Sequence, residues 1–323
     1  MTPSRRQFLQ VATFAAALPA VSRVALGQTY PTRPVRWIVP YPPGGATDLV
    51  ARVLGRWLSE RLGQQFIIEN RPGGGTNIGV QVAVNSSSDG YTLLLFGSTN
   101  AINATLFQSL PFNLLRDITP VAGLVALPLV LEVNPSVPVR SVAEFIAYAK
   151  ANPSKINVAS FGSGTISHLA LELFKSMTGV DVVHVPYRGG AAVAADLVGG
   201  QVQAAFDALP SSLPYIRSGV LRALALTARS NALPDVPTIG EIVAGYEVNT
   251  WLGLGVPKGP PPEIIAVLNR EVNAGLADPA IKAQFTEVGA TPFVFTAAAF
   301  TAYVAAETEK WAKVIKLTGV PAE

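Results

Sequence analysis

The sequence predicts an α/β protein built from two lobes, each a mostly parallel sheet with flanking helices, joined by a hinge. Three observations support this fold class. Short apolar stretches typical of strands alternate along the chain with amphipathic helical patterns, as in parallel sheets covered by helices. The chain of 323 residues exceeds the size at which a single core usually stops growing. No flexible linker separates the halves, so we expect strands to cross between the lobes.

The first strand and helix illustrate the pattern. Residues 35–39 are predicted to form a buried strand, and residues 47–62 a helix with apolar positions three to four residues apart. This helix should end at Gly63, because glycine favours the left-handed conformation that closes many helices. Further strands are predicted over 66–69, 92–96, 129–133, 156–159, 182–185, 204–206, 221–225 and 252–256, and further helices over 76–84, after Ser141, from Pro261-Pro262 and at the end of the chain.

The lobe boundaries follow from where the chain would cross. The stretches 119–133 and 226–250 are rich in proline and irregular, so we expect both to be crossings. Lobe I would then contain residues 28–122 and 227–323, from both ends of the chain. Lobe II would contain residues 123–226.

Residues 1–27 have the pattern of a cleavable export signal. Arg5-Arg6 precedes a short apolar stretch, and Ala25-Leu26-Gly27 supplies the small residues that signal peptidase prefers. The paired arginines before Phe8-Leu9 resemble a twin-arginine signal, and an ordinary secretory signal is the alternative. We therefore expect a periplasmic protein.

Composition excludes several classes of function. Lys and Arg number 24 against 21 Asp and Glu, but residues 1–27 hold three arginines and no acids, so the remainder is balanced. A balanced chain has no field to attract nucleic acid or anionic lipid. The absence of cysteine excludes disulfides and thiolate chemistry, and the two histidines have no metal-ligand spacing. After residue 27 no apolar run reaches the roughly 18 residues that span a bilayer.

Four loops share one design: each follows a strand, contains Gly, Ser, Thr or Pro, and precedes a helix. They are residues 41–48, 97–100, 161–165 and 187–190. Ligands bind at the carboxyl ends of strands in open α/β sheets, and a helix N-terminus offers free N–H groups to an anion. Ordinary turn chemistry is the alternative for any single loop. The candidate ligand-binding residues are Tyr41, Pro43, Gly44, Gly45, Thr47, Asp48, Ser98, Thr99, Asn100, Ser163, Gly164, Thr165, Tyr187 and Asp207.

Asp207 and residues 71–77 complete the set of polar loops. Asp207 ends an apolar strand, where its carboxylate could accept a ligand's amine or hydroxyl or could cap the next helix. For the glycine-rich stretch 71–77 we expect a tight turn at the edge of the lobe. No nucleotide-binding glycine motif is present. Ser163 with His168 suggests a hydrolase, but the nucleophile-elbow motif is missing and His168 lies only one helical turn away.

Motifs spread over the chain resemble those of the solute receptors of tripartite tricarboxylate transporters, also called Bug receptors. The matching stretches are 30–35, 42–48, 69–79, 89–94, 162–165 with His168, 185–190, 199–202, 219–225 and 256–257. The resemblance implies a two-lobed periplasmic binding protein that closes on its ligand. It further implies that the first loop and residues 162–165 hold a carboxylate through backbone N–H groups and water, without an arginine clamp. Side chains near 98–100 and Asp207 would set the ligand.

We therefore predict a non-enzymatic receptor without cofactor or metal, monomeric, that passes a small organic carboxylate to membrane permease subunits. The carboxylate could be a di- or tricarboxylate, an amino acid or an aromatic acid. Two other functions stay open: a ligand-sensing subunit for a periplasmic sensor domain, and an exported serine hydrolase. Neighbouring genes for multispan membrane proteins would favour transport, and a histidine kinase gene would favour sensing.

The export signal gives the first testable prediction. The exported protein should begin at Gln28, as N-terminal sequencing of periplasmic material would establish. Replacing Arg5 and Arg6 by lysine should block export if the twin-arginine route is used, and should leave a secretory signal working. Periplasmic protein that still begins at Met1 would contradict the prediction of cleavage.

Overall fold

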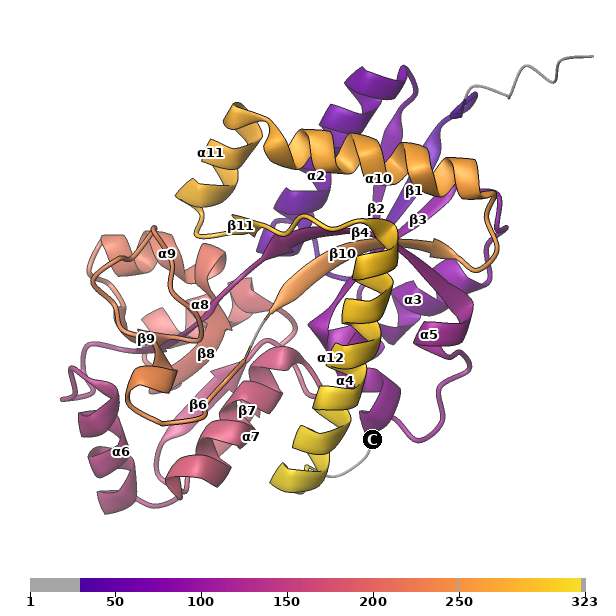
Figure 1. Ribbon diagram of the computed structural model, residues 1–323. Coiled ribbons are helices and arrows are strands. Elements are labelled where there is room, and N and C mark those ends of the chain that lie inside the picture. The colour runs from indigo at the N-terminus through magenta and orange to yellow at the C-terminus, as the bar shows by residue number, and fades with distance from the viewer. Residues whose placement is uncertain (1–29, 249, 321–323) are drawn as a thin grey trace, which may run out of the picture.

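The computed structural model describes residues 30–248 and 250–320, so the predicted export signal lies outside the described residues. Two sheets flanked by helices form the two ends of the molecule (Figure 1), which confirms the predicted fold class. The sheet near the N-terminus has the strand order β11-β4-β10-β3-β1-β2. The other sheet has the order β7-β6-β8-β5-β9.

The first sheet combines both ends of the chain. Its strands are β1 (Val35–Val39), β2 (Phe66–Asn70), β3 (Thr92–Gly97), β4 (Ile118–Ala126), β10 (Trp251–Pro257) and β11 (Thr291–Pro292). Strands β1, β2 and β3 are parallel to one another, whereas β10 is antiparallel to both β3 and β4. Strands β1 to β4 therefore point the same way, and β10 runs against them because it enters from the other half of the molecule.

The second sheet comes from the middle of the chain. Its strands are β5 (Leu129–Val133), β6 (Asn157–Ser160), β7 (Val183–Pro186), β8 (Ala204–Ala208) and β9 (Arg222–Leu226). Strands β7, β6 and β8 are parallel, and β5 is antiparallel to β8 and β9. As in the first sheet, the parallel strands have their carboxyl ends at one edge of the sheet. The strand that enters from the other half, here β5, is antiparallel to its neighbours.

Both predicted crossings connect the sheets, and the first is more regular than expected. Strand β4 continues to Ala126 and β5 begins at Leu129, so the chain changes sheets at Leu127-Pro128 rather than at residue 122. The irregularity predicted for 119–133 is wrong, since pairing with β10 and β8 keeps these residues extended. The second crossing is irregular apart from the short helix η2 (Ile239–Glu241). The crossings are joined where the Leu127 N–H donates to the Thr250 carbonyl at 2.9 Å.

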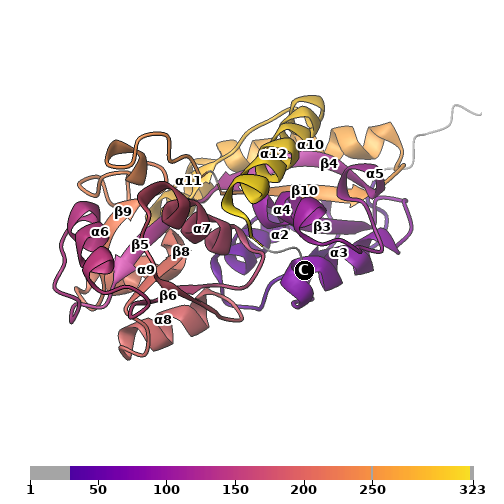
Figure 2. The ribbon, with the colours of Figure 1, turned by 90° about the horizontal axis from the view of Figure 1, so that it is seen from below.

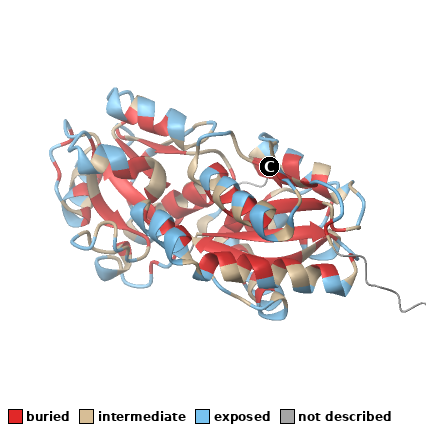
Figure 3. Cartoon of the chain, turned by 90° about the horizontal axis from the view of Figure 1, so that it is seen from above, coloured by how far each residue is buried: buried red, intermediate tan, exposed pale blue. Residues whose placement is uncertain are grey.

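Helices cover both faces of each sheet, and the strands and parts of the helices are coloured as buried (Figure 3). Several predicted helix ends are confirmed. Gly63 ends its helix with a φ of 70°, and the side chain of Ser141 accepts a hydrogen bond from the Glu144 N–H. The helices are α2 (Ala46–Leu62), η1 (Gly74–Thr76), α3 (Asn77–Val84), α4 (Ser98–Leu106), α5 (Leu114–Asp117), α6 (Val142–Ala151), α7 (Ile166–Thr178), α8 (Gly190–Val198), α9 (Leu209–Arg217), α10 (Pro262–Ala277), α11 (Pro279–Glu287) and α12 (Ala297–Thr318).

The last helix, α12, packs against both halves of the molecule (Figures 1 and 2). It contacts β4 and α4 of the first half and α7 of the second. Its buried Glu307 accepts hydrogen bonds from the indole N–H groups of Trp251 and Trp311, each at 3.2 Å. A carboxylate in an apolar interior must be hydrogen-bonded, so Glu307 fixes where α12 lies on β10. One continuous cluster of buried apolar side chains extends from the first sheet through α12 to the second.

Candidate functional site

A cavity with a volume of about 560 Å³, which we call the main cavity, lies between loops of the two halves. Loops from both halves form its wall. From the first half come residues 40–42, the glycine-rich stretch 72–76 and Phe107. From the second half come residues 161–163, Thr165 and residues 187–189. Four segments distant in sequence therefore meet at the carboxyl ends of parallel strands, where α/β sheets bind ligands.

A smaller cavity of about 90 Å³, the side pocket, adjoins the main cavity and shares Tyr41, Pro42, Phe161, Arg188 and Gly189 with it. Its further lining residues are Pro43, Gly45, Ala46, Thr47, Gly190, Ala191, Asp207, Ala208 and Ser211. Among the described residues, Arg188 and Asp207 are the only charged ones that line either cavity. Apart from this one cation, the walls offer backbone groups and hydroxyls to a ligand.

Eight of the predicted binding residues line one of the two cavities: Tyr41, Pro43, Gly45, Thr47, Ser163, Thr165, Tyr187 and Asp207. The other six line neither: Gly44, Asp48, Ser98, Thr99, Asn100 and Gly164. Those that line neither hold the loops in place, as their hydrogen bonds show below.

The first loop leads into α2 without a side-chain cap. The cap residue is Gly45, and the first intrahelical bond runs from the Leu49 N–H to its carbonyl. Among the described residues, the N–H groups of Gly45, Ala46 and Thr47 have no protein acceptor, as helix starts require unless a side chain supplies one. All three residues line the side pocket, so this helix start offers free donors there.

Asp48, predicted to bind ligand, fixes this loop instead. Its carboxylate accepts hydrogen bonds from the Gly44 N–H at 2.9 Å, Arg52 Nε at 2.8 Å and Asn70 Nδ2 at 2.9 Å. Burial alone would raise the pKa of the Asp48 carboxyl, but the bonds from Arg52, Gly44 and Asn70 outweigh burial, and the pKa is lowered. The ionised carboxylate is thus fully engaged, which removes it from the cavity wall.

Residues 98–100 are buried rather than exposed to a ligand. The Ser98 hydroxyl accepts from the Trp251 N–H, and the Thr99 hydroxyl is hydrogen-bonded to Tyr41 and accepts from the Ile166 N–H. The Asn100 side chain accepts a hydrogen bond from the Gly97 N–H and donates one to the Thr76 hydroxyl, each at 2.9 Å. These side chains point inward because α4 begins directly at the strand end, and they join the loops of both halves.

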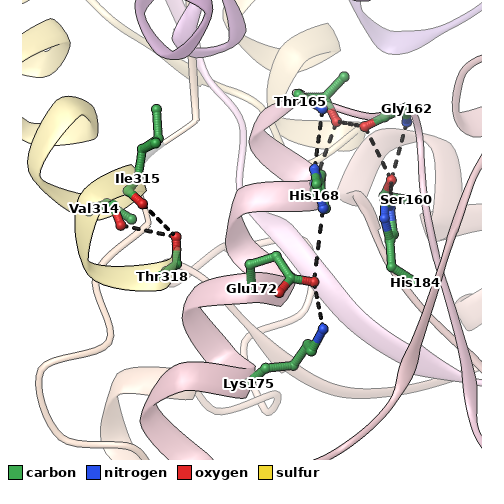
Figure 4. Close-up of polar contacts among 11 residues, drawn as sticks. Ser160, Gly162, Thr165, His168, Glu172, Lys175, His184, Val314, Ile315 and Thr318 are labelled. Atoms are coloured by element: carbon green, nitrogen blue, oxygen red, sulfur yellow. Dashed lines mark hydrogen bonds and ion pairs between the residues drawn. The ribbon is translucent and has the colours of Figure 1, made fainter. Parts of the chain in front are cut away.

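The loop before α7 has fewer free donors than predicted. Thr165 caps α7, the Gly164 N–H donates to His168 Nδ1 at 3.2 Å, and the Gly162 N–H donates to Ser160 Oγ (Figure 4). A side chain at Gly164, where φ is 70°, would meet Leu106 at 2.8 Å. Gly164 therefore packs against α4 while its N–H is occupied, and Ser163 and Thr165 present this loop to the main cavity.

The loop before α8 is the second place with free donors. Helix α8 has Gly189 as its cap residue and no side-chain cap, like α2. Among the described residues the N–H groups of Gly190 and Ala191 have no protein acceptor, and both residues line the side pocket. The neighbouring Tyr187 donates its hydroxyl to Asp196 at 2.7 Å. Burial and this bond raise the pKa of Tyr187 to about 12.

Residues 71–77 form the predicted tight turn after the edge strand β2, with Thr76 at the N-cap position of α3, but Pro72 to Thr76 also line the main cavity, which was not predicted from the sequence. Gly73, Gly74 and Gly75 all have positive φ values, and Thr76 also has a φ of 82°. The Asn103 side chain donates to the Gly75 carbonyl at 2.6 Å and so holds the loop against α4. A single tight turn does not need three consecutive glycines. This run of glycines in the sequence could have indicated a cavity wall whose backbone a ligand approaches closely.

Asp207 ends β8 at the floor of the side pocket and is fully buried. Its Oδ1 accepts the Ala208 N–H at 2.8 Å, and its buried Oδ2 has no hydrogen-bond partner. Burial raises the pKa of Asp207 to about 7. Glu132 on β5 is also buried; burial and the Asp207 charge raise its pKa to about 8, and one of its oxygens accepts from the Ser212 hydroxyl. An unpartnered carboxylate oxygen beside a cavity is poised to accept a ligand's donor.

The two histidines stack beneath the α7 loop rather than forming a hydrolase site. Their rings lie 4.0 Å apart at an angle of 8°. Ser163 makes no hydrogen bond to either ring among the described contacts, while Ser160 Oγ and His184 Nε2 share one of 2.6 Å. Ser160 is fully buried, so it could not reach a substrate. Within the described residues no group of His, Asp and Glu could hold a metal ion, and no helix is long and apolar enough to cross a membrane.

Two sheets joined by paired crossings, with a polar cavity between their loops, define a two-domain solute-binding protein. Residues 50–320 match the tripartite tricarboxylate transporter family receptor, and the chain belongs to this family of periplasmic solute-binding receptors, which are not enzymes. The chain is 40% identical over 310 residues to the protein BugT of Bordetella pertussis, with 94% of each chain covered.

Solved structures agree with this assignment. The structure of R. palustris Rpa4515 with adipate is 37% identical with a TM-score of 0.86, over 90% of this chain and 98% of that one. The structure of MatC from Rhodopseudomonas palustris with bound malate is 30% identical with a TM-score of 0.82, over 88% of this chain and 100% of that one.

The histidine stack predicts a loss of stability in acid. Burial, and for His184 the neighbouring His168, lower both pKa values, that of His184 from 6.5 to about 3. Below pH 6.5 the two histidines therefore bind protons in the unfolded chain but stay neutral in the folded protein. The free energy of unfolding consequently falls as the pH drops toward 3. The variant His168→Gln/His184→Gln should lose less in melting temperature between pH 7 and pH 4.5 than the wild type does, by a few degrees. An equal drop in melting temperature for the wild type and the variant would contradict this explanation.

Proposed function

We propose that this protein captures a small organic carboxylate between its two halves in the periplasm and delivers it to a tripartite tricarboxylate-type permease. The supporting observation is the pair of uncapped helix starts, α2 and α8, whose free N–H groups face one pocket from opposite halves. Backbone N–H groups at a helix N-terminus stabilise an anion through hydrogen bonds and the helix dipole. Adipate and malate in the related structures are carboxylates of suitable size.

The halves act as two lobes that close on the ligand. Lobe I carries the first sheet and lobe II the second, and the paired crossings at Leu127 and Thr250 form the hinge. The apolar cluster shared through α12 resists separation on that side, so the loops around the cavities move most. A carboxylate bound to α2 and α8 gains interactions only when both lobes surround it, which makes closure depend on the ligand.

The anchoring relies on backbone donors more than on Arg188. The Arg188 residue is exposed on its turn, where water screens its charge. The α2 and α8 donors lie on ordered helices and need no rotamer to be fixed on binding. This arrangement differs from the prediction for residues 162–165 because Thr165 and His168 already occupy donors of the α7 loop.

A carboxylate screen tests the proposed function. We expect at least one of adipate, succinate, malate, an amino acid or an aromatic acid to raise the melting temperature, since binding to the folded state alone stabilises by about 2.7 kcal/mol at a hundred times Kd. Small-angle scattering with that compound should give a smaller radius of gyration than without it. If no carboxylate stabilises the protein, the proposed function is wrong, and a tight ligand that leaves the scattering unchanged would refute lobe closure.

Glycine variants test the backbone anchor. Gly45→Val should weaken carboxylate binding by a hundredfold or more, because a side chain there enters open space at the pocket wall. Its φ of −84° suits any residue, so the fold should persist by circular dichroism. Arg188→Ala should change the affinity by less than tenfold, about 1.4 kcal/mol, measured by calorimetry.

Lys150→Ala, an exposed position on α6, controls for the loss of one positive charge in Arg188→Ala. A larger loss of carboxylate affinity for Arg188→Ala than for Gly45→Val would show that Arg188, and not the backbone, anchors the carboxylate.

A further inference from the structure

We propose that the side pocket binds the head group of an α-amino carboxylate, with its carboxylate at the starts of α2 and α8 and its ammonium on Asp207. This inference rests on the proposed function and narrows its ligand class from carboxylates to amino acids. The main cavity would then hold the remainder of the amino acid.

The ammonium half of the subsite is the free oxygen of Asp207. This residue is fully buried, lines the side pocket, and leaves Oδ2 without a partner while Oδ1 accepts the Ala208 N–H. A buried polar atom without a hydrogen-bond partner destabilises the folded protein. An ammonium group carries three donors and satisfies this oxygen, with the hydroxyl of Ser211 at the same wall as a second acceptor.

The start of α8 approaches Asp207 closely at Gly190. A Cβ atom at Gly190 would lie 2.9 Å from Asp207 Oδ1, 3.1 Å from Oδ2 and 3.0 Å from Ser211 Oγ. Gly190 is the first residue of α8 and is not among the glycines with positive φ, so its backbone does not require glycine. Glycine is needed here because the start of α8 packs closely against both acceptors, so a side chain at this position would displace the Asp207 carboxylate and the Ser211 hydroxyl.

The carboxylate half comes from the free N–H groups of Gly45, Ala46 and Thr47 on one side and of Gly190 and Ala191 on the other. These donors and Asp207 line one pocket of about 90 Å³, so an anion and a cation bound there must be close neighbours. In an α-amino acid both groups are attached to one carbon atom. A dicarboxylate would instead place a second negative charge near Asp207.

Glu132 explains how Asp207 can carry its charge. Burial raises the pKa of both carboxyls, and the charge of Asp207 further raises that of Glu132, so Glu132 keeps its proton while Asp207 loses one. Glu132 does not line the pocket, and its Oε1 is bound by Ser212 at 2.6 Å. The negative charge of the pair is therefore on Asp207, which lines the pocket, and a ligand ammonium there stabilises it.

Three matched ligands test the proposal: L-aspartate, L-malate and succinate, which differ only in carrying an ammonium, a hydroxyl or a hydrogen on one carbon. Calorimetry at pH 7.5 should give at least tenfold tighter binding of aspartate than of succinate. The sets glutamate, 2-hydroxyglutarate and glutarate, and phenylalanine, phenyllactate and 3-phenylpropionate, extend the comparison to other side chains. We expect the amino member to bind best within any set that binds.

Variants assign the effect to the side pocket. Asp207→Asn should reduce the preference for the amino member at least tenfold, and Gly190→Ala should do so without changing any charge. Glu132→Gln, buried but outside the pocket, should leave the order of the three ligands unchanged. Should Asp207→Asn fail to fold by circular dichroism, Gly190→Ala alone decides between the outcomes.

The outcomes separate this proposal from the proposed function. If succinate or another des-amino member binds as tightly as its amino partner, the ammonium subsite is overturned while carboxylate capture stands. Tighter succinate binding at pH 5.5 than at pH 7.5 would point instead to a protonated Asp207 that donates to a second carboxylate. If no member of any set binds, both the subsite and the proposed function fail.

Discussion

The buried carboxylate of Asp48 fixes the loop on which the cavity depends. It binds the Gly44 N–H, Arg52 and Asn70 together, and Asn70 in turn donates to the Tyr41 carbonyl at 3.0 Å. The loop between β1 and α2 is thereby tied to β2 at both of its ends. The cap residue of α2 is Gly45, which has no side chain to accept the first N–H groups of the helix. The first N–H groups of that helix consequently remain free at the pocket wall.

Some helix starts have a side-chain cap, whereas the two at the side pocket have none. Helices α6, α7, α11 and α12 are capped by Ser141, Thr165, Asp278 and Thr296, whose side chains accept N–H groups of the first turn. Helices α2 and α8 have glycine caps with no such bond, and both begin at the side pocket. A capped start satisfies its own donors, whereas an uncapped start leaves them for solvent or ligand. Helices α3, α4, α9 and α10 also lack a side-chain cap, so the feature particular to α2 and α8 is that both free helix starts line the same pocket.

Buried polar groups differ in the same way between the frame and the site. Glu307 is satisfied by two indoles and holds α12 on β10, on the side where the lobes share their core. Asp207 has an oxygen without a partner at the cavity floor, and the histidine stack lies directly beneath the α7 loop. Proteins tolerate such unsatisfied or neutral buried groups mainly where binding or motion uses them. The second half therefore carries the unpartnered carboxylate and the pH sensitivity, while both halves supply ligand contacts.

The sequence by itself determined the alternation of strands and helices, the helix ends at Gly63 and Ser141, and the family through its loop motifs, since these depend on local periodicity and turn chemistry. Only the tertiary structure decided which loop residues face the cavities. Asn100 and Asp48 point inward because their partners, Thr76 and Asn70, are distant in sequence and are brought near by sheet pairing. The glycine stretch 73–75 lines the main cavity for the same reason: its neighbours across the cavity belong to the other sheet, and local sequence does not encode that distance.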